Sequence, residues 1–186
     1  MNTLITGGSG FIGSALVDFL VNKGYIVTIV SRQRLKLKGI NVIRSTQEIP
    51  AEEKVDIIIN LAGETINKRW SDSYKEELIN SRLKVTNDVI SLIKKLKSKP
   101  SLLISASAIG YYGSQNNNYI DESSSYIEGF THKLCSLWES EAKKAEDFGV
   151  RTCITRLGVV LGKNKGALKQ MLPIFKLGLG GRIGSG

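Results

Sequence analysis

The segment "TGGSGFIG", Thr6 to Gly13, decides the fold. It follows the apolar run 2–6, which is typical of a buried parallel strand, and it opens the helix-periodic stretch "FIGSALVDFLVNKG". Gly7, Gly10 and Gly13 let the chain turn sharply into a helix and let a pyrophosphate approach the backbone. We interpret the segment as a dinucleotide-binding loop, with the phosphates on the free N–H groups of the helix N-terminus. The alternative is a glycine-rich turn that binds no ligand.

Outward from this loop, strand and helix patterns alternate along the chain. Strands are expected at 2–6, 25–30, 40–44, 55–63, 101–107 and from 151, and helices at 11–24, 71–97 and 129–148. In the first helix, Ile12, Ala15, Leu16, Phe19 and Leu20 are expected to face the core. Such alternation predicts a doubly wound α/β fold, a parallel sheet with helices on both faces. Ligands of such sheets bind at the carboxyl ends of the strands, so candidate residues should directly follow a strand.

Composition limits the classes of partner and compartment. The chain has 26 Lys+Arg against 17 Asp+Glu, a net charge of +9, but the lysines are dispersed and no aromatic residues interleave with them. We therefore expect an anionic ligand or a solvated basic surface rather than a nucleic-acid partner. Two cysteines and one histidine have no metal-ligand spacing. No apolar run reaches the ~20 residues that cross a bilayer, and no signal peptide is recognised, so we expect a cytoplasmic protein without membrane contact.

The end of the second strand bears on the choice of dinucleotide. An Asp or Glu there would bind the ribose 2′-OH of NAD. The sequence instead continues "IVSRQRLKLK", which places Ser31, Arg32 and Arg34 at this point. A guanidinium suits a 2′-phosphate through paired, charge-assisted hydrogen bonds. We predict NADP as the cofactor; NAD and a merely solvated basic loop remain alternatives.

Several further motifs carry a family resemblance. They are "NLAGETINKRW" (60–70), "INSRLKVTNDV" (79–89), "SASAIGYYG" (105–113), "TRLGVVLG" (155–162) and "GALKQMLPIFKLGLGGRIGSG" (166–186). Together with the glycine loop they resemble the extended short-chain dehydrogenase/reductase superfamily. The likeness is greatest to its "epimerase family protein" branch, which is similar to nucleotide-sugar epimerases but has undefined substrates. The resemblance covers essentially the whole chain, and "AGE…RW" with "SR" is specific to the branch.

The resemblance implies a domain organisation. Members of this family are longer than 186 residues, so the chain is expected to be a fragment. Residues 1–156 would form the dinucleotide-binding Rossmann domain, and 157–186 the start of a truncated substrate-binding lobe. A small polar molecule is the expected substrate.

The resemblance also implies site residues. Ser105 and Ser107 lie where the superfamily has its substrate-orienting serine or threonine, and the spacing to Tyr112 favours Ser107. The positions that match cofactor-binding segments of the family are Gly7, Gly10, Phe11, Ile12 and Gly13 in the loop, Leu61, Ala62 and Gly63 on the adenosine ribose side of the cofactor, and Leu157, Gly158 and Val159 near the nicotinamide carboxamide.

One family motif is missing. Superfamily enzymes usually carry Tyr-x-x-x-Lys at the start of the helix after the long polar loop, but no tyrosine here has a lysine four residues on. Aligning Glu139 with the usual helix glutamate places Thr131 and Cys135 at those two positions, so we interpret this helix as non-catalytic. Tyr112 is the predicted stand-in, and its neighbour Tyr111 could exchange roles with it.

The predicted function is that of an NADP(H)-binding epimerase-like protein or reductase. The first alternative is a non-enzymatic protein in which NADP(H) is structural or a redox signal. The second is a basic RNA-binding module, which would require strongly salt-dependent binding.

Overall fold

The structure is a computed structural model that describes residues 1–33, 37–115, 118–162 and 165–182. The chain forms two compact units, Met1–Arg156 and Leu157–Gly186. The main elements of the first unit are β1 (Asn2–Thr6), α1 (Phe11–Asn22), β2 (Ile26–Val30), β3 (Asn41–Ile43), β4 (Ile57–Asn60), α2 (Asp72–Lys95), β5 (Leu102–Ala108), α3 (Phe130–Lys143) and β6 (Arg151–Leu157), with short 3-10 turns η1 (Thr46–Glu48), η2 (Ile109–Tyr111) and η3 (Lys144–Phe148).

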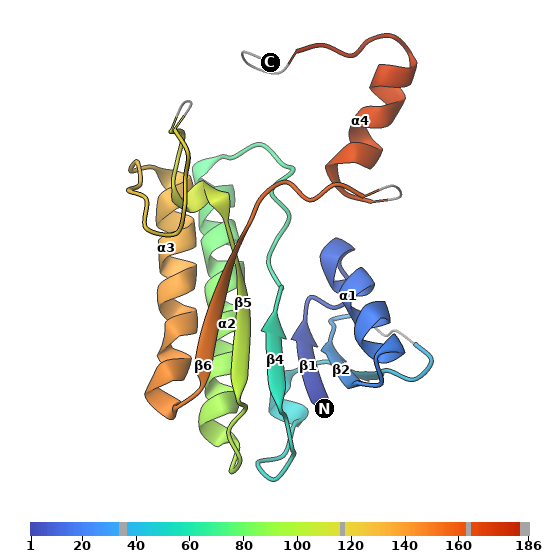
Figure 1. Ribbon diagram of the computed structural model, residues 1–186, viewed down its shortest axis with the longest axis vertical. Helices are drawn as coiled ribbons and strands as arrows, with labels where there is room; N and C mark the ends of the chain where they lie inside the picture. Colours follow the sequence, from blue (N-terminus) through green and yellow to red (C-terminus); the bar gives the residue numbers. More distant parts are fainter. Residues whose placement is uncertain (34–36, 116–117, 163–164, 183–186) are drawn as a thin grey trace. The chain divides into compact units, whose positions relative to one another are not determined.

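The strands form one sheet in the order β3-β2-β1-β4-β5-β6 (Figure 1). β1 pairs in parallel with β2 on one side and with β4 on the other. β2 pairs in parallel with β3, and β4 with β5. This arrangement confirms the predicted doubly wound parallel sheet. It also brings the carboxyl ends of β1, β4 and β5 to one edge, where ligands of such sheets bind.

The two faces of the sheet carry different helices. Leu4, Ile58 and Leu103 pack into one buried cluster with apolar residues of α2 and the end of α3. Ile5 and Ile59, next in sequence on the same strands, pack into a second cluster with residues of α1. Successive strand residues point to opposite faces, so these apolar runs bury both sides of the sheet. Figure 1 shows α2 and α3 lying side by side, with α1 apart from them.

The rotation of α1 differs from the expectation. Val17 is buried, whereas Phe19 and Ala15 are exposed. The buried face of the helix runs through Gly13, Val17 and Leu20. The cause lies in the glycine loop, because a Cβ added at Gly13 would be only 2.2 Å from the carbonyl oxygen of Gly7. Position 13 therefore faces the backbone of the glycine loop, and Val17 and Leu20 are buried on the same side of the helix.

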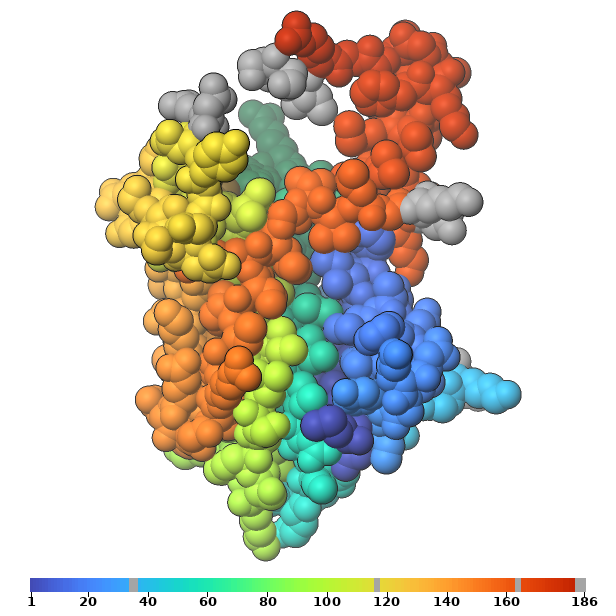
Figure 2. Space-filling view, in the orientation of Figure 1, coloured from blue at the N-terminus to red at the C-terminus, as the bar shows by residue number. Residues whose placement is uncertain are grey.

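A polar loop over 113–129 connects η2 to α3, as the sequence predicts. Tyr126 and Ile127 are about half exposed within it, and Tyr119 is fully exposed. Figure 2 shows the described residues of this loop, in yellow, projecting at the end of the sheet where β5 terminates. The loop therefore lies at the ligand-binding edge of the first unit.

The second unit contains α4 (Gly166–Lys176), which has Pro173 within it. An isolated antiparallel bridge joins Leu161 to Gly166. Among the residues that the structure describes, no helix is long and apolar enough to cross a lipid bilayer.

Candidate functional site

The glycine loop is held in close backbone contact with two neighbouring elements. Gly7 has φ +72°, and an added Cβ would lie 2.8 Å from the carbonyl carbon of Leu61. The Leu61 N–H donates to Thr6 O at 3.1 Å, and the Ala62 N–H donates to Thr6 Oγ1 at 3.3 Å. Only glycine fits at Gly7, where the end of β1 and the start of α1 lie against the residues that follow β4. This is the backbone geometry that a pyrophosphate-binding turn requires.

The N-terminus of α1 is open to an anion. Gly10 is the N-cap and has no side chain to accept a hydrogen bond, and the first turn holds no acidic residue. The first N–H groups of a helix have no partner within the helix, and its dipole favours negative charge there. Phe11, Ile12 and Gly13 present these N–H groups, so the loop fits the phosphates of a dinucleotide.

The end of β2 contains the residues predicted to select the dinucleotide. Ser31 is buried: its N–H donates to Ile43 O at 2.9 Å, and its hydroxyl accepts from the Gln33 N–H at 3.2 Å. Arg32 is exposed and forms no ion pair with any residue in the described ranges. Arg34 lies outside the described residues. Ser31 therefore shapes the turn, and Arg32 is exposed beside it.

A buried chain of polar side chains crosses the core behind this edge. The Asn60 amide accepts from Thr6 Oγ1 at 2.6 Å and donates to Thr86 Oγ1 at 3.0 Å and Ser105 Oγ at 3.3 Å. Trp138 Nε1 also donates to Thr86 Oγ1, at 3.1 Å. Ser105 is thus occupied inside the core, two residues before Ser107 on the same strand.

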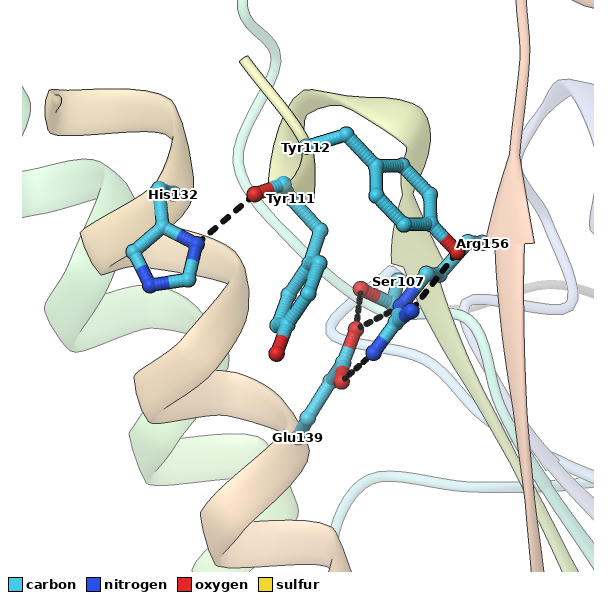
Figure 3. A network of polar contacts seen from close by, with 6 residues as sticks. All are labelled: Ser107, Tyr111, Tyr112, His132, Glu139 and Arg156. Carbon is cyan, nitrogen blue, oxygen red and sulfur yellow. Dashed lines mark hydrogen bonds and ion pairs between the residues drawn. The ribbon is translucent and has the colours of Figure 1, made fainter. Parts of the chain in front are cut away.

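A second polar network lies at the ends of β5 and β6 (Figure 3). Arg156 forms a two-pronged ion pair with Glu139, in which Nε donates to Oε1 at 2.9 Å and Nη2 to Oε2 at 2.8 Å. Ser107 Oγ donates to the same carboxylate at 2.6 Å, and Arg156 Nη1 donates to the Tyr112 hydroxyl at 2.7 Å. The network therefore connects the two residues predicted to be catalytic, Ser107 and Tyr112, through an ion pair of a buried carboxylate and a partly exposed guanidinium.

The charges of this pair stabilise each other. Burial alone would raise the pKa of Glu139, but hydrogen bonds from Arg156 and Ser107 and the charge of Arg156 outweigh it, so the pKa lies below its usual value. The hydrogen bonds to Glu139 raise the pKa of Arg156, against the opposing effect of burial. Both groups are therefore ionised at neutral pH.

Aromatic rings surround the arginine. The Arg156 guanidinium lies 3.5 Å from the centre of the Tyr111 ring, which is a close cation–π contact. His132 Nδ1 lies 2.7 Å from Tyr111 O, and the His132 ring stacks on Tyr126 at 3.6 Å with an interplanar angle of 6°. Tyr111 and His132 thus anchor the polar loop to α3. This contact gives the chain's single histidine a structural role.

Cys135 is buried on the inner side of α3, and burial raises the pKa of its thiol. A neutral buried thiol is a poor nucleophile, in agreement with the interpretation that this helix is not catalytic. Cys153 is exposed, and neither cysteine forms a disulfide. The described part of the chain holds no group of three or more His, Cys, Asp and Glu side chains placed to bind a metal ion.

The structure brings most of the predicted site residues to one edge of the first unit. The glycine loop, Leu61–Gly63 and Ser31 directly follow strands, Ser107 lies within the last residues of β5, and Tyr112 follows the turn η2 after that strand. Leu157, Gly158 and Val159 belong to the second unit. Sequence reasoning missed the buried contacts of Asn60 and the ion pair of Arg156. For Asn60, the available signal was a polar residue at the end of an apolar run.

Comparisons with known proteins extend these observations. A family model described as "NAD dependent epimerase/dehydratase family" matches residues 3–177. The chain is similar to Epimerase family protein YfhF of Bacillus subtilis (strain 168), with 39% identity over 193 residues that cover 100% of this chain and 63% of the relative. It is also similar to the chloroplastic SDR39U1 homolog of Arabidopsis thaliana, 36% identical over 197 residues, with 100% and 56% covered.

Among solved structures, the chain resembles the crystal structure of human epimerase family protein SDR39U1 (isoform 2) with NADPH. The TM-score is 0.88 at 36% identity, over 100% of this chain and 63% of the human chain. The chain thus spans less than two thirds of the length of each of these relatives.

Proposed function

The chain belongs to the NAD dependent epimerase/dehydratase family, and from this premise we propose that it binds NADP(H) at the carboxyl edge of its sheet. In the full-length protein, this cofactor would serve an epimerase-like or reductase activity on a small polar substrate. The observation that carries the proposal is the glycine loop, in which Gly7 and Gly13 are packed against backbone and Gly10 leaves the start of α1 open. The human relative solved with NADPH supports this choice of cofactor.

The topology orders the parts of the cofactor along the edge. The pyrophosphate would lie on the glycine loop after β1, and the adenosine 2′-phosphate beside Ser31 and Arg32 after β2. The nicotinamide half would then extend past Leu61–Gly63 towards β5. Residues 157–186 would begin the substrate-binding lobe. We expect a cytoplasmic protein with no nucleic-acid partner.

We predict that the protein prefers NADPH to NADH and that Arg32→Ala removes most of this preference. A charge-assisted contact of this kind changes affinity by at least about tenfold, and calorimetry with both nucleotides would measure it. Arg151→Ala is the matched control. Arg151 is an exposed arginine at the amino end of β6, whereas Arg32 follows the carboxyl end of β2. Equal affinities of the wild type for NADPH and NADH would contradict the assignment.

The polar network suggests different roles for the two candidate catalytic hydroxyls. Ser107 donates its proton to Glu139, so towards a substrate it can only accept a hydrogen bond. The Tyr112 hydroxyl accepts a hydrogen bond from Arg156, so its own O–H group is left to donate. Bound NADP(H) would supply the hydride chemistry. In the reductive direction, Tyr112 would donate the accompanying proton, and Ser107 would orient the substrate.

In the full-length protein, Tyr112→Phe is expected to lower turnover at least about tenfold, because a placed proton donor typically contributes 10²–10⁴-fold. Cys135→Ala should change turnover little, since that thiol is buried and neutral. The 186-residue chain should bind nucleotide without turnover. If Cys135→Ala were the inactive variant and Tyr112→Phe active, α3 would be the catalytic element and the assignment would be wrong.

A second function has its own support. Ser107 and Tyr112 are both buried and engaged by an ion pair, and Tyr-x-x-x-Lys is missing from the sequence. These features also suit a protein in which NADP(H) is structural or a redox signal. Turnover by the full-length protein with NADPH and a panel of small carbonyl compounds would separate the two functions.

A further inference from the structure

Arg82 is a buried arginine without a carboxylate partner. It lies on α2 and is 9% exposed. Its Nη1 donates to Leu78 O at 3.0 Å and its Nη2 to Glu64 O at 3.1 Å. Among the described residues, no carboxylate lies within ion-pair distance of it. A guanidinium has five N–H donors, so these two bonds leave donors free for another acceptor.

Burying such a charge is unfavourable for the isolated chain. Burial lowers the pKa of Arg82, and the electrostatic effects of Cys135, Tyr74 and Glu64 oppose that shift only in part. The Trp138 ring, 5.2 Å from the guanidinium carbon, adds a cation–π contact. An unpaired buried cation costs several kcal/mol in real proteins. A methionine or leucine would fill the same space without this cost, so the cation is better explained by a ligand.

The position of the guanidinium indicates which ligand. A Cβ added at Gly63 would lie 3.0 Å from the guanidinium carbon, so the arginine packs directly under the loop after β4. On its other side, the guanidinium lies over the Trp138 ring of α3, and its Nη2 donates to Glu64 O in the loop after β4. Arg82 therefore lies between α3 and the loop that follows the carboxyl end of β4.

We propose that Arg82 binds the nicotinamide-ribose half of the dinucleotide. This inference rests on the proposed function, which places the pyrophosphate after β1 and the adenosine end after β2. The remaining half of the cofactor then has to run past the loop after β4, under which Arg82 packs. Ribose hydroxyl and phosphate oxygens are suitable acceptors for the free N–H groups of Arg82. Arg82 would thus be a second cationic contact, at the end of the cofactor opposite to Arg32.

A control variant can distinguish ligand binding by Arg82 from a purely structural role in holding the loop after β4. The loop after β4 is also held to α2 by two other side chains: Ser81 Oγ accepts from the Glu64 N–H at 3.2 Å, and the Tyr74 hydroxyl donates to Thr65 O. Tyr74→Phe therefore loosens the same loop without changing any charge. It is the matched control for Arg82→Met, which removes the cation and its donors while keeping the length of the side chain.

The experiment measures affinities of the 186-residue chain for two probes, NADPH and adenosine 2′,5′-bisphosphate, which lacks the nicotinamide half. We expect Arg82→Met to weaken NADPH at least about tenfold, the usual effect of a lost hydrogen bond to a charged group. The bisphosphate affinity should stay unchanged, Arg82→Lys should recover part of the loss, and Tyr74→Phe should bind both probes like the wild type.

Two results would overturn the proposal: unchanged NADPH binding in Arg82→Met, or an equal loss for both probes. Thermal unfolding monitored by circular dichroism verifies that each variant is folded. Failure of the wild type to bind NADPH at all would contradict the proposed function instead, so the two failures are distinguishable.

Discussion

Gly10→Val is expected to abolish NADPH binding while the fold remains intact. Gly10 has φ −72°, which valine tolerates, and an added Cβ would meet only the Gly7 carbonyl oxygen, at 3.1 Å. The valine methyl groups would occupy the space that the pyrophosphate needs above the helix N-terminus. We expect a loss of at least about a hundredfold in affinity, which corresponds to about 2.8 kcal/mol.

Calorimetry with NADPH would measure the loss, and circular dichroism would verify the fold. Ala15→Val is the control, because Ala15 is exposed on the same helix and away from its N-terminus. If Gly10→Val bound NADPH as tightly as the wild type, the cofactor would not lie on this loop. The central assignment would then be wrong.

Arg156→Met is expected to lower the free energy of unfolding, by less than the about 3–5 kcal/mol that breaking a fully buried ion pair costs, because the Arg156 side chain is 19% exposed. Glu139 is 4% exposed, so without Arg156 its carboxylate would be buried with a single hydrogen bond, from Ser107. Urea unfolding of the variant and the wild type would measure the difference.

Two further measurements attribute the loss to the charge. The double variant Glu139→Gln/Arg156→Met should regain much of the stability, because no unpaired charge remains. The difference between Arg156→Met and the wild type should also shrink in acid. The pKa of Glu139 is lowered in the folded protein, so its contribution is present above the unfolded value of about 4.3 and is lost as the pH falls below it. A deficit independent of pH would point to lost packing instead.

The fold could be predicted because its signals are local. Each strand is a short apolar run followed by turn residues, and Gly7, Gly10 and Gly13 are separated by fixed intervals whose geometric consequence is known. In α1, the expectation holds for Leu20 and Leu16 and fails for Phe19 and Ala15. Hydrophobicity alone favoured Phe19, but the contact of Gly13 with Gly7 turned the helix towards Val17. The backbone contact at Gly13, rather than the size of the Phe19 side chain, therefore determines which face of α1 is buried.

The polar networks could not be predicted from the sequence. Glu139 and Arg156 are 17 positions apart and lie on a helix and a strand. Nothing in either element's periodicity indicates that their side chains meet. Arg82 falls on the buried face of α2, where a hydrophobic residue would be expected. Only the structure shows that no carboxylate of the described residues forms an ion pair with it. Pairings of this kind depend on the packing of elements against one another, which periodicity does not encode.

The buried chain centred on Asn60 has a consequence for how the protein folds. Asn60 meets Thr6 across 54 positions and Ser105 across 45, and Thr86 meets Trp138 across 52. Contacts so distant in sequence form slowly, because closing a long loop costs conformational entropy before the contact can stabilise the chain. During synthesis, a chain that ends after β4 would leave the Asn60 amide without Thr86 and Ser105. The amino-terminal half is therefore expected to stay open until β5 emerges, and the burial of Trp138 on α3, monitored by its fluorescence, would mark a still later step of folding.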